Sequence, residues 1–559
     1  MEESFTQPHP LSCYLLIRVC LAVTFLSPLR AEVKPHALFC DGAVLQQGVP
    51  IPVWGMARDR EQITLELAGQ TFSTTAKDGK WKVEFPALKA GGPHTITIKG
   101  DNQIVIKDVL VGEVWLCSGQ SNMEFTLVAA STWEAEKSRA DIPKLRMFKV
   151  KRQVSDEPAA DVTGSWLVCT PENAAKFSAV GYFMGRDLHA ATGVPVGIIN
   201  STKGGTWAQA WVSLQGYESS GNTNAVQKIR EYAAGYPRRL AEFPAKQKAY
   251  EAAVAEWKKT DGPAQEKALK DWKAKSDASA KARQPFTEPQ LTITIPKPTA
   301  PDAPEGGPNG YSVLFNGMIA PLAPYPFKGV AWYQGESNCN AKGAPLYRGI
   351  LSTLVGDWRR HFGRPDLPFL IVQLPAFKSN LPKIREAQLH LPEIREAQLL
   401  TVKKSPPAAV IVTTDVGDTN NLHPPNKEPV GARLALAARG IAYGEPFEYS
   451  GPMYDSMKVE GNRVVLTFTH VGKGLVAKDG PLKGFTIASQ DGVFVVAKAS
   501  IEGSTVVVSA DGVSAPVAVR YGWDTVPDIN LYNREGLPAS PFRTDSAKPL
   551  QSPTPASSP

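Results

Sequence analysis

Apolar and polar positions alternate along the first part of the chain. Between Ala31 and about Asp108 the apolar positions form three runs, which are Ile63, Leu65 and Leu67, then Trp81, Val83 and Phe85, then Ile96 and Ile98. A period of two residues is typical of strands with one buried face. Asp78-Gly79 and Gly91-Gly92-Pro93 supply turns between such strands. The pattern predicts a small antiparallel β-sandwich over residues 32–108.

The pattern changes at Val109, where apolar segments begin to alternate with helical stretches. The apolar segments are Val111–Cys117, Val196–Asn200, Gly329–Tyr333, Phe369–Val372 and Ala408–Thr413. Strands that are apolar on both faces belong to a parallel sheet that helices cover on both sides. We therefore expect residues 109–448 to form a three-layer α/β/α domain.

An insertion interrupts this domain at residues 216–308. Tyr250, Val254 and Trp257 have helical spacing, and Asp261-Gly262-Pro263 breaks the run. We expect a helical hairpin followed by a Pro-rich linker.

Alternation returns after about Tyr449 and predicts a second β-sandwich over residues 449–545. Residues 546–559 are polar and rich in Ser and Pro, which indicates a disordered tail.

A short tandem repeat stands out near the end of the α/β region. Residues 381–390 (LPKIREAQLH) recur as residues 391–400 (LPEIREAQLL). Ten residues of helix advance by about 1000°, roughly 80° short of three turns, and Pro392 would break a helix running through both copies. The two copies cannot pack identically, so we expect one of them to be a surface insertion.

Composition narrows the class of protein. The chain has 559 residues, 43% hydrophobic and 21% charged, which is typical of a globular protein with several domains. Its formal net charge is only +7, and much of the lysine lies between residues 246 and 283. This distribution does not form a nucleic-acid-binding face, so no nucleic-acid partner is expected.

The first 31 residues resemble a secretory leader. Arg18 precedes the apolar stretch Val19–Leu26, and Ala31 precedes the expected mature start at Glu32. No other segment approaches the ~18 consecutive apolar residues that cross a bilayer. We expect a signal peptide at residues 1–31 and a secreted or periplasmic protein with no membrane partner after its cleavage.

Ser121 follows the first strand of the α/β region. The strand runs into Ser118-Gly119-Gln120-Ser121, which places the Ser121 hydroxyl at the carboxyl end of a parallel strand, where open α/β sheets bind ligands. A nucleophile suits this position, although a serine after a strand is also typical of a helix N-cap.

Two later strands end in groups that suit an oxyanion site. One leads to Gly204-Gly205, whose backbone N–H groups can approach a ligand closely, although an ordinary tight turn would use the same glycines. The other leads to the segment from Gln334 to Asn338, whose side-chain amides are possible donors to an oxyanion.

The last strand of the region delivers Asp415, Asp418 and His423 into a Pro-rich loop. Among the histidines after the leader, His423 alone follows a predicted parallel strand with carboxylates within eight residues. An exposed loop histidine is the alternative. The chain has no H-E-x-x-H motif or other close histidine pair, so neither a metal nor another cofactor is expected.

These four segments together resemble the conserved blocks of the SGNH hydrolase superfamily and, more closely, the sialate O-acetylesterase family within it. The similar stretches are GEVWLCSGQSNME (112–124), Gly204-Gly205-Thr206 with Ala210-Trp211, WYQGESN (332–338), His423-Pro424 with Asn426-Lys427, and Asn530-Leu-Tyr-Asn533. The resemblance spans about Leu38 to Asp545 and is weakest in the helical insertion.

The resemblance implies a serine esterase that removes O-acetyl groups from carbohydrates through an acetyl-enzyme intermediate, without a cofactor. Ser121 would be the nucleophile and His423 the base. The implied oxyanion donors are the amides of Ser121 and of Gly204 or Gly205, with the side chain of Gln334 or, as second choice, Asn338. The implied substrate-binding residues are Gln120, Asn122 and Glu336.

The third catalytic residue is open, because Asn420 stands where many SGNH enzymes have an acid three residues before the histidine. Asp418 is the expected acid, Asp415 is the alternative, and a Ser–His dyad oriented by a backbone carbonyl is a third possibility.

The implied substrate is an O-acetylated sialate. A different enzyme, an acetylxylan or other polysaccharide O-acetylesterase, is the first alternative, since one fold serves many substrates. A noncatalytic glycan-binding protein is the second, and the intact Ser121 and His423 argue against it.

Overall fold

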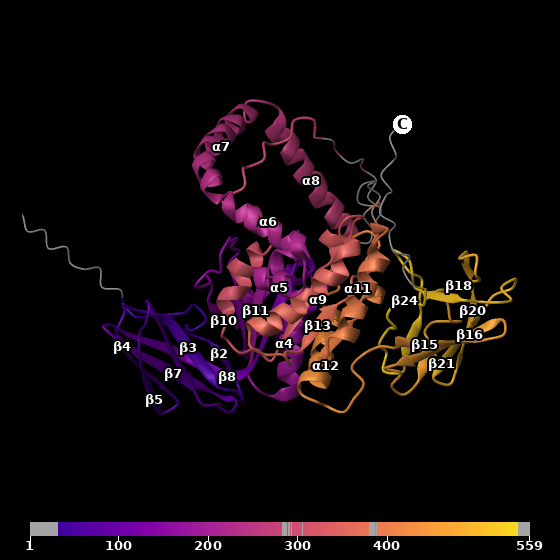
Figure 1. The fold of residues 1–559 in the computed structure, drawn as a ribbon, viewed down its shortest axis with the longest axis horizontal. Helices are drawn as coiled ribbons and strands as arrows, with labels where there is room; N and C mark the ends of the chain where they lie inside the picture. The colour runs from indigo at the N-terminus through magenta and orange to yellow at the C-terminus, as the bar shows by residue number, and fades with distance from the viewer. Residues whose placement is uncertain are drawn as a thin grey trace, which may run out of the picture.

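The computed structural model describes residues 32–281, 288, 291, 293–304, 306–378, 386 and 388–545. The predicted leader and tail lie outside the described residues. Figure 1 shows a central body of strands and helices with a β-rich unit at each end. The predicted mixed α/β fold with β-rich flanking regions is confirmed.

The N-terminal unit contains two sheets. One has the strand order β1 (Lys34–Pro35), β3 (Ile51–Met56), β6 (Lys80–Phe85), and the other joins β5 (Gln70–Thr75), β4 (Gln62–Leu67), β7 (Gly91–Lys99) and the start of β8 (Gln103–Gly119). Ile63 and Leu65 of one sheet and Trp81 and Val83 of the other are buried. The alternation seen in the sequence therefore marks the inner faces of the two sheets.

Strand β8 belongs to two sheets at once. Its first part pairs antiparallel with β7, and its last part pairs parallel with β11 and β12. The short β2 (Val44–Gln46) also pairs with it in parallel. The boundary expected between residues 108 and 109 thus lies inside one continuous strand. The change of sequence pattern there matches a change in burial, because every residue from Val109 to Gly119 is buried.

The central sheet has the order β10-β9-β11-β8-β12-β13-β14. Its other strands are β9 (Ile142–Lys149), β10 (Trp166–Cys169), β11 (Val196–Thr202), β12 (Gly329–Tyr333), β13 (Phe369–Val372) and β14 (Ala408–Ile411). Only β10 runs antiparallel to its neighbour. The apolar pattern of the sequence does not reveal β9, because Lys144 and Arg146 interrupt its apolar run.

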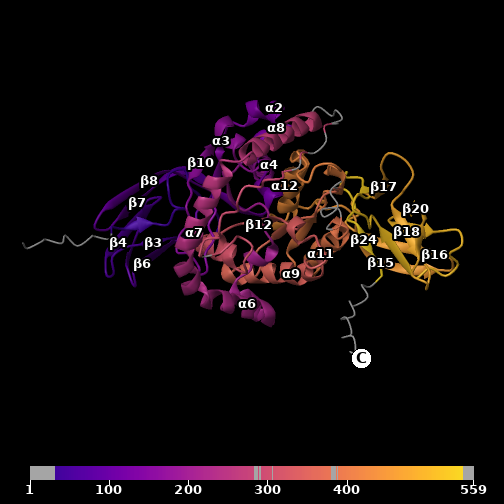
Figure 2. The same cartoon turned by 90° about the horizontal axis from the view of Figure 1, so that it is seen from above.

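Helices cover both faces of this sheet (Figures 1 and 2): α4 (Ala179–Thr192) packs with α12 (Glu428–Ala442), and α9 (Ala344–His361) packs with α11 (Leu391–Lys404). Trp115 donates a hydrogen bond to Tyr443, just after α12, at 3.1 Å. The ring of Trp332 lies 5.7 Å from that of Trp358 in α9. Trp332 of β12 is aligned with Ser118 of β8, so these two side chains lie on the same face of the sheet. Ser118 is three residues beyond Trp115, and strand residues an odd number apart face opposite sides. The two helix pairs therefore lie on opposite faces.

The described part of the insertion is helical, but its helices form an open arch rather than the packed hairpin expected from the sequence. After α5 (Leu214–Ser219), the helices α6 (Thr223–Ala234), α7 (Tyr236–Trp257) and α8 (Gly262–Lys281) form an arch above the body in Figure 1. The break at Asp261-Gly262-Pro263 separates α7 from α8. The Pro-rich linker is described only in part.

The second copy of the repeat forms most of α11, which begins at Leu391 with Pro392 in its first turn. Leu399 is 4% exposed, whereas Leu389, the matching residue of the first copy, is 67% exposed. The two copies therefore differ in packing at this position. Residues 381–385 and 387 lie outside the described part of the chain.

The C-terminal unit contains two four-stranded sheets, β15-β16-β21-β20 and β19-β18-β22-β24, and the pair β17-β23. Val464 and Leu466 of the first sheet share a buried core with Ile487 and Val519 of the second. The strands are β15 (Met453–Glu460), β16 (Arg463–Thr469), β17 (Leu475–Ala477), β18 (Phe485–Ala488), β19 (Phe494–Val496), β20 (Lys498–Glu502), β21 (Thr505–Ser509), β22 (Ala518–Tyr521), β23 (Leu531–Asn533) and β24 (Phe542–Arg543).

Three short helices complete the described fold, namely α1 (Ser121–Glu124), α2 (Trp133–Glu136) and α3 (Pro171–Ala175). Across the described ranges, no helix combines the length and the apolar character needed to span a membrane.

Candidate active site

Ser121 lies at the point of the central sheet where the order of strand addition reverses. The chain leaves β8 toward β9 and β11 on one side and later returns to β12, β13 and β14 on the other, so β8 is the switch point at which open α/β sheets bind ligands. Gly119 makes the turn after β8 with φ +131°, and a Cβ there would lie 2.1 Å from the carbonyl oxygen of Tyr333. Only glycine fits this position, and the tight turn brings Ser121 to the edge of the sheet as the first residue of α1.

Ser121 and His423 meet although they are 302 residues apart. Their Oγ and Nε2 atoms are 2.8 Å apart, which is hydrogen-bond distance. Burial lowers the pKa of the half-buried His423 from 6.5, and the nearby Lys427 cation lowers it further. The imidazole is therefore neutral near pH 7 and able to accept the serine proton.

The expected acid does not contact His423. Oδ1 of Asp418 instead accepts a hydrogen bond from the Asn420 amide at 2.9 Å. Asp415 forms an ion pair with Arg433 at 2.6 Å. Within the described chain no carboxylate is hydrogen-bonded to His423, because both candidates are held by nearer partners.

Two of the expected oxyanion donors are used elsewhere. Nε2 of Gln334 donates to the Thr206 carbonyl oxygen at 3.0 Å and to Oδ1 of Asn338 at 2.8 Å. Nδ2 of Asn338 donates to Gln209 at 2.9 Å. Both side chains are fully buried, so they fasten the loop after β11 to the end of β12. Both amide hydrogens of Gln334 are therefore already bonded, which argues against the oxyanion role expected for its side chain.

Gly204 and Gly205, the glycines after β11, differ in whether the backbone amide already has a hydrogen-bond partner. The Gly204 amide donates to Oε2 of Glu124 at 3.0 Å. Gly205, with φ +72°, borders the same cavity as Ser121. The structure therefore commits the Gly204 amide to Glu124 and brings Gly205 beside the nucleophile.

A buried chain of polar side chains lies directly behind the Ser–His pair. Nζ of Lys427 donates to Oδ1 of Asn122 at 2.5 Å, and Nδ2 of Asn122 donates to Oε1 of Glu336 and, at 3.1 Å, to the carbonyl oxygen of Leu422. Asn122 follows Ser121 and Leu422 precedes His423, so this amide joins the segments that carry the Ser–His pair.

Burial shifts both charged groups of this chain. It lowers the pKa of Lys427 to about 7 and raises that of Glu336. Asn122 is fully buried and does not border the cavity, which argues against the substrate-binding role expected for it.

A cavity of about 320 Å³ opens beside Ser121 and His423. Gln120 and Glu336, both expected to bind substrate, line it. Oε1 of Gln120 accepts hydrogen bonds from the backbone amides of Gly335, at 3.4 Å, and Ser337, at 3.3 Å. The apolar part of its wall consists of Leu374, Pro375, Phe377, Leu391 and Leu422. The cavity thus combines an apolar wall with a few polar groups, as small-molecule sites do.

Glu124 and Lys427 take part in this site, although the sequence did not predict a role for either. Both lie within the motifs that carried the resemblance, and Lys427 stands four residues after His423. That spacing was the only sign in the sequence that Lys427 belongs to the site. Its partners Asn122 and Glu336 come from two distant segments.

A Ser–His pair at the carboxyl edge of a parallel sheet is an arrangement that serine hydrolases use. Residues 307–439 match the family model described as "Carbohydrate esterase, sialic acid-specific acetylesterase". The chain is 36% identical to a carbohydrate acetylesterase from Xanthomonas citri, with a TM-score of 0.73, covering 92% of this chain and 100% of that one.

Curated relatives give the same result. Sialate O-acetylesterase of Mus musculus is 27% identical over 537 residues, which covers 88% of this chain and 90% of the relative. That of Homo sapiens is 28% identical over 540 residues, with 88% of each covered. The chain belongs to the sialate O-acetylesterase family of carbohydrate esterases, and it is a carboxylic ester hydrolase.

Proposed function

We propose that Ser121 and His423 carry out the carbohydrate O-deacetylation of this family through an acetyl-enzyme. The observation that supports it is the 2.8 Å contact between Oγ and Nε2, made inside a cavity at the switch point of the sheet. Oγ attacks the acetyl carbonyl carbon while Nε2 takes the hydroxyl proton. The imidazolium then protonates the departing sugar oxygen, and a water activated by His423 releases acetate from Ser121.

The oxyanion that forms in both steps needs donors fixed in advance. We assign the amides of Ser121 and Gly205 to this role. Ser121 is the first residue of α1, where backbone N–H groups have no partner within the helix, and Gly205 borders the cavity.

The chain from Lys427 through Asn122 to Leu422 does part of what a triad acid does elsewhere. A triad acid orients the histidine ring and stabilises the imidazolium. Here Asn122, the residue after Ser121, is hydrogen-bonded to the backbone carbonyl of Leu422, the residue before His423. This bond fixes the distance between base and nucleophile. A cation cannot stabilise the imidazolium, so this arrangement favours a neutral resting base instead.

The substrate has two candidates. Sialate is the substrate in the names of the curated relatives, and an O-acetylated sialate is therefore the first. Acetylxylan or another neutral polysaccharide is the second, and one observation favours it: no lysine or arginine is among the described residues that line the catalytic cavity, so a sialic acid carboxylate would find no cationic side chain there.

We further propose that the central region, residues 109–448, is an SGNH-type domain between β-sandwich domains at 32–108 and 449–545. We also propose that the protein is exported after removal of residues 1–31. N-terminal sequencing of the exported protein, expected to begin at Glu32, tests the second point.

The decisive experiment compares wild type with Ser121→Ala on O-acetylated sialate and on acetylated xylan. The variant should keep its circular dichroism and lose more than about a thousandfold in acetate release, as loss of a covalent nucleophile does. Acid-quenched wild type should carry one acetyl group on the Ser121 peptide. A variant that retains a tenth of the activity contradicts the assignment.

A further inference from the structure

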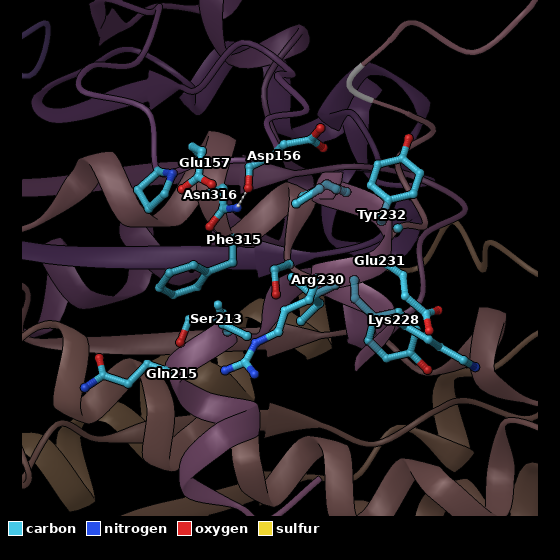
Figure 3. A pocket seen from close by; sticks show the side chains of 18 of the residues that line it. Asp156, Glu157, Ser213, Gln215, Lys228, Arg230, Glu231, Tyr232, Phe315 and Asn316 are labelled. Atoms are coloured by element: carbon cyan, nitrogen blue, oxygen red, sulfur yellow. Dashed lines mark hydrogen bonds between the residues drawn. The ribbon is translucent and has the colours of Figure 1, made fainter. Parts of the chain in front are cut away.

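A second and larger cavity lies outside the catalytic machinery. Its volume is about 1000 Å³, against about 320 Å³ for the catalytic cavity. Its wall comes from the loop after β9, from α5, α6 and the start of α7, and from residues 310–320 (Figure 3). The insertion, the least family-like part of the sequence, thus builds most of one side.

The wall has features that packing alone does not explain. Ser312 has φ +66°, a backbone region that L-residues rarely adopt. Its side chain is 1% exposed, and its hydroxyl has no hydrogen-bond partner among the described residues. Residues Phe315–Ile319 form a π-helix. Strained backbone, unsatisfied buried groups and π-helical turns are all enriched at binding sites.

The chemistry of the wall selects a ligand class. Charges of both signs border the cavity and partly pair with each other, Arg239 with Asp156 at 3.1 Å and Arg230 with Glu218 at 2.8 Å. The aromatic rings of Tyr232, Tyr311 and Phe315 lie among them. Carboxylates, guanidinium groups and amides hydrogen-bond to hydroxyls, whereas a charged ligand would be repelled by the groups of its own sign in the wall.

The two cavities have no described lining residue in common, but one loop connects their walls. Gly205 borders the catalytic cavity, and its carbonyl oxygen accepts a hydrogen bond from Asn309 at 3.3 Å. Gly310, the next residue, borders the larger cavity. The Ser312 amide also donates to Gln209 at 3.2 Å. The loop that begins at Gly204 therefore lies between the two cavities.

We propose that the larger cavity binds a neutral carbohydrate segment, namely a stretch of the polymer whose acetyl group is cleaved at Ser121. This inference rests on the proposed function for the link between the two sites. The cavity holds the polysaccharide backbone, and the loop from Gly204 to Ser213 divides this holding site from the reaction site. The enzyme then prefers acetylated polymers to small acetyl esters.

Two substitutions that fill the cavity test the proposal. Lys228 and Gln215 border it, and both are exposed, so Lys228→Trp and Gln215→Trp add bulk without disturbing a buried core. Lys248→Trp, on the exposed surface of α7, is the matched control. We expect kcat/KM on acetylated xylan to fall about tenfold in both cavity variants, with 4-nitrophenyl acetate hydrolysis unchanged. Lys248→Trp should leave both rates unchanged.

Calorimetric titration of Ser121→Ala protein with unacetylated xylan oligosaccharides makes the test independent of catalysis. Binding that Lys228→Trp weakens supports the second site even if the Ser121 assignment fails. The proposal is overturned if the cavity variants and the control behave alike on acetylated xylan and in titration. Tighter binding of a sialic acid oligomer than of xylan oligosaccharides also overturns it.

Discussion

At the scale of single residues, the active site differs from a complete triad in the charge near His423. Burial and the Lys427 cation both lower the pKa of His423 below 6.5. Since the neutral imidazole is the proposed active form, kcat/KM should rise with pH through a midpoint below 6.5. Acetate release measured from about pH 4 to pH 8 gives the midpoint. A midpoint above 6.5 would indicate a carboxylate partner that the structure lacks.

Lys427→Met tests the source of this shift. Methionine fills similar space without a charge, so the imidazolium becomes less unfavourable and the midpoint should move to higher pH. The hydrogen bond to Asn122 is lost as well, which loosens the Ser–His geometry, so kcat should fall about tenfold or more with little change in KM. Arg439→Met, in the helix α12 that begins just after Lys427, removes an arginine paired with Glu445, serves as the control and should change neither value.

Asp418→Asn separates the dyad from the triad. Because Asp418 contacts Asn420 rather than His423, the variant should stay within about threefold of wild type in kcat. His423→Ala should lose about a thousandfold or more in the same assay. A loss of about a hundredfold in Asp418→Asn would restore Asp418 as the triad acid.

At the scale of elements, the repeat offers a matched pair of identical side chains. Leu399→Ala removes a side chain that is 4% exposed in α11 and should cost about 2–5 kcal/mol of unfolding free energy. Leu389→Ala removes one that is 67% exposed and should stay within about 0.5 kcal/mol. Urea unfolding followed by tryptophan fluorescence measures both. Equal effects would mean that the copies exchange places in solution.

Strand ends were predictable from the sequence, but the partners of their side chains were not. Apolar runs located β8, β11, β12, β13 and β14, and the carboxyl ends of parallel strands share one edge, so Ser121 and His423 could be expected to meet. Nothing in the sequence shows that Thr206 and Asn338 take both amide hydrogens of Gln334. Such bonds depend on loop paths that only tertiary packing decides.

At the scale of the whole molecule, the β-rich units are joined to the catalytic region by more than linkers. Strand β8 runs unbroken from the N-terminal sheet to the turn before Ser121. The C-terminal unit touches the other end of the site, where Oγ of Ser540 accepts a hydrogen bond from Gln373 at 2.9 Å. Both units therefore brace the sheet that carries the reaction.

Arg395 tests this bracing. It is fully buried in α11, and its guanidinium donates to the carbonyl oxygens of Leu374 and Pro375 in the cavity wall and of Asp524 and Thr525 in the C-terminal unit. Arg395→Met leaves these carbonyls without their donor, so we expect a loss of about 3 kcal/mol or more and a lower melting temperature.

The same variant should raise KM for the acetylated substrate more than it lowers kcat, because Leu374 and Pro375 border the cavity while Ser121 and His423 are held by other contacts. Arg463→Met removes a half-exposed arginine at the start of β16, which is paired with Glu460 of β15. It controls for loss of a surface charge and should leave both quantities unchanged. If Arg395→Met lowers the melting temperature without changing KM, the junction stabilises the fold but does not shape the cavity. If it changes neither, the C-terminal unit does not brace the active site through this residue.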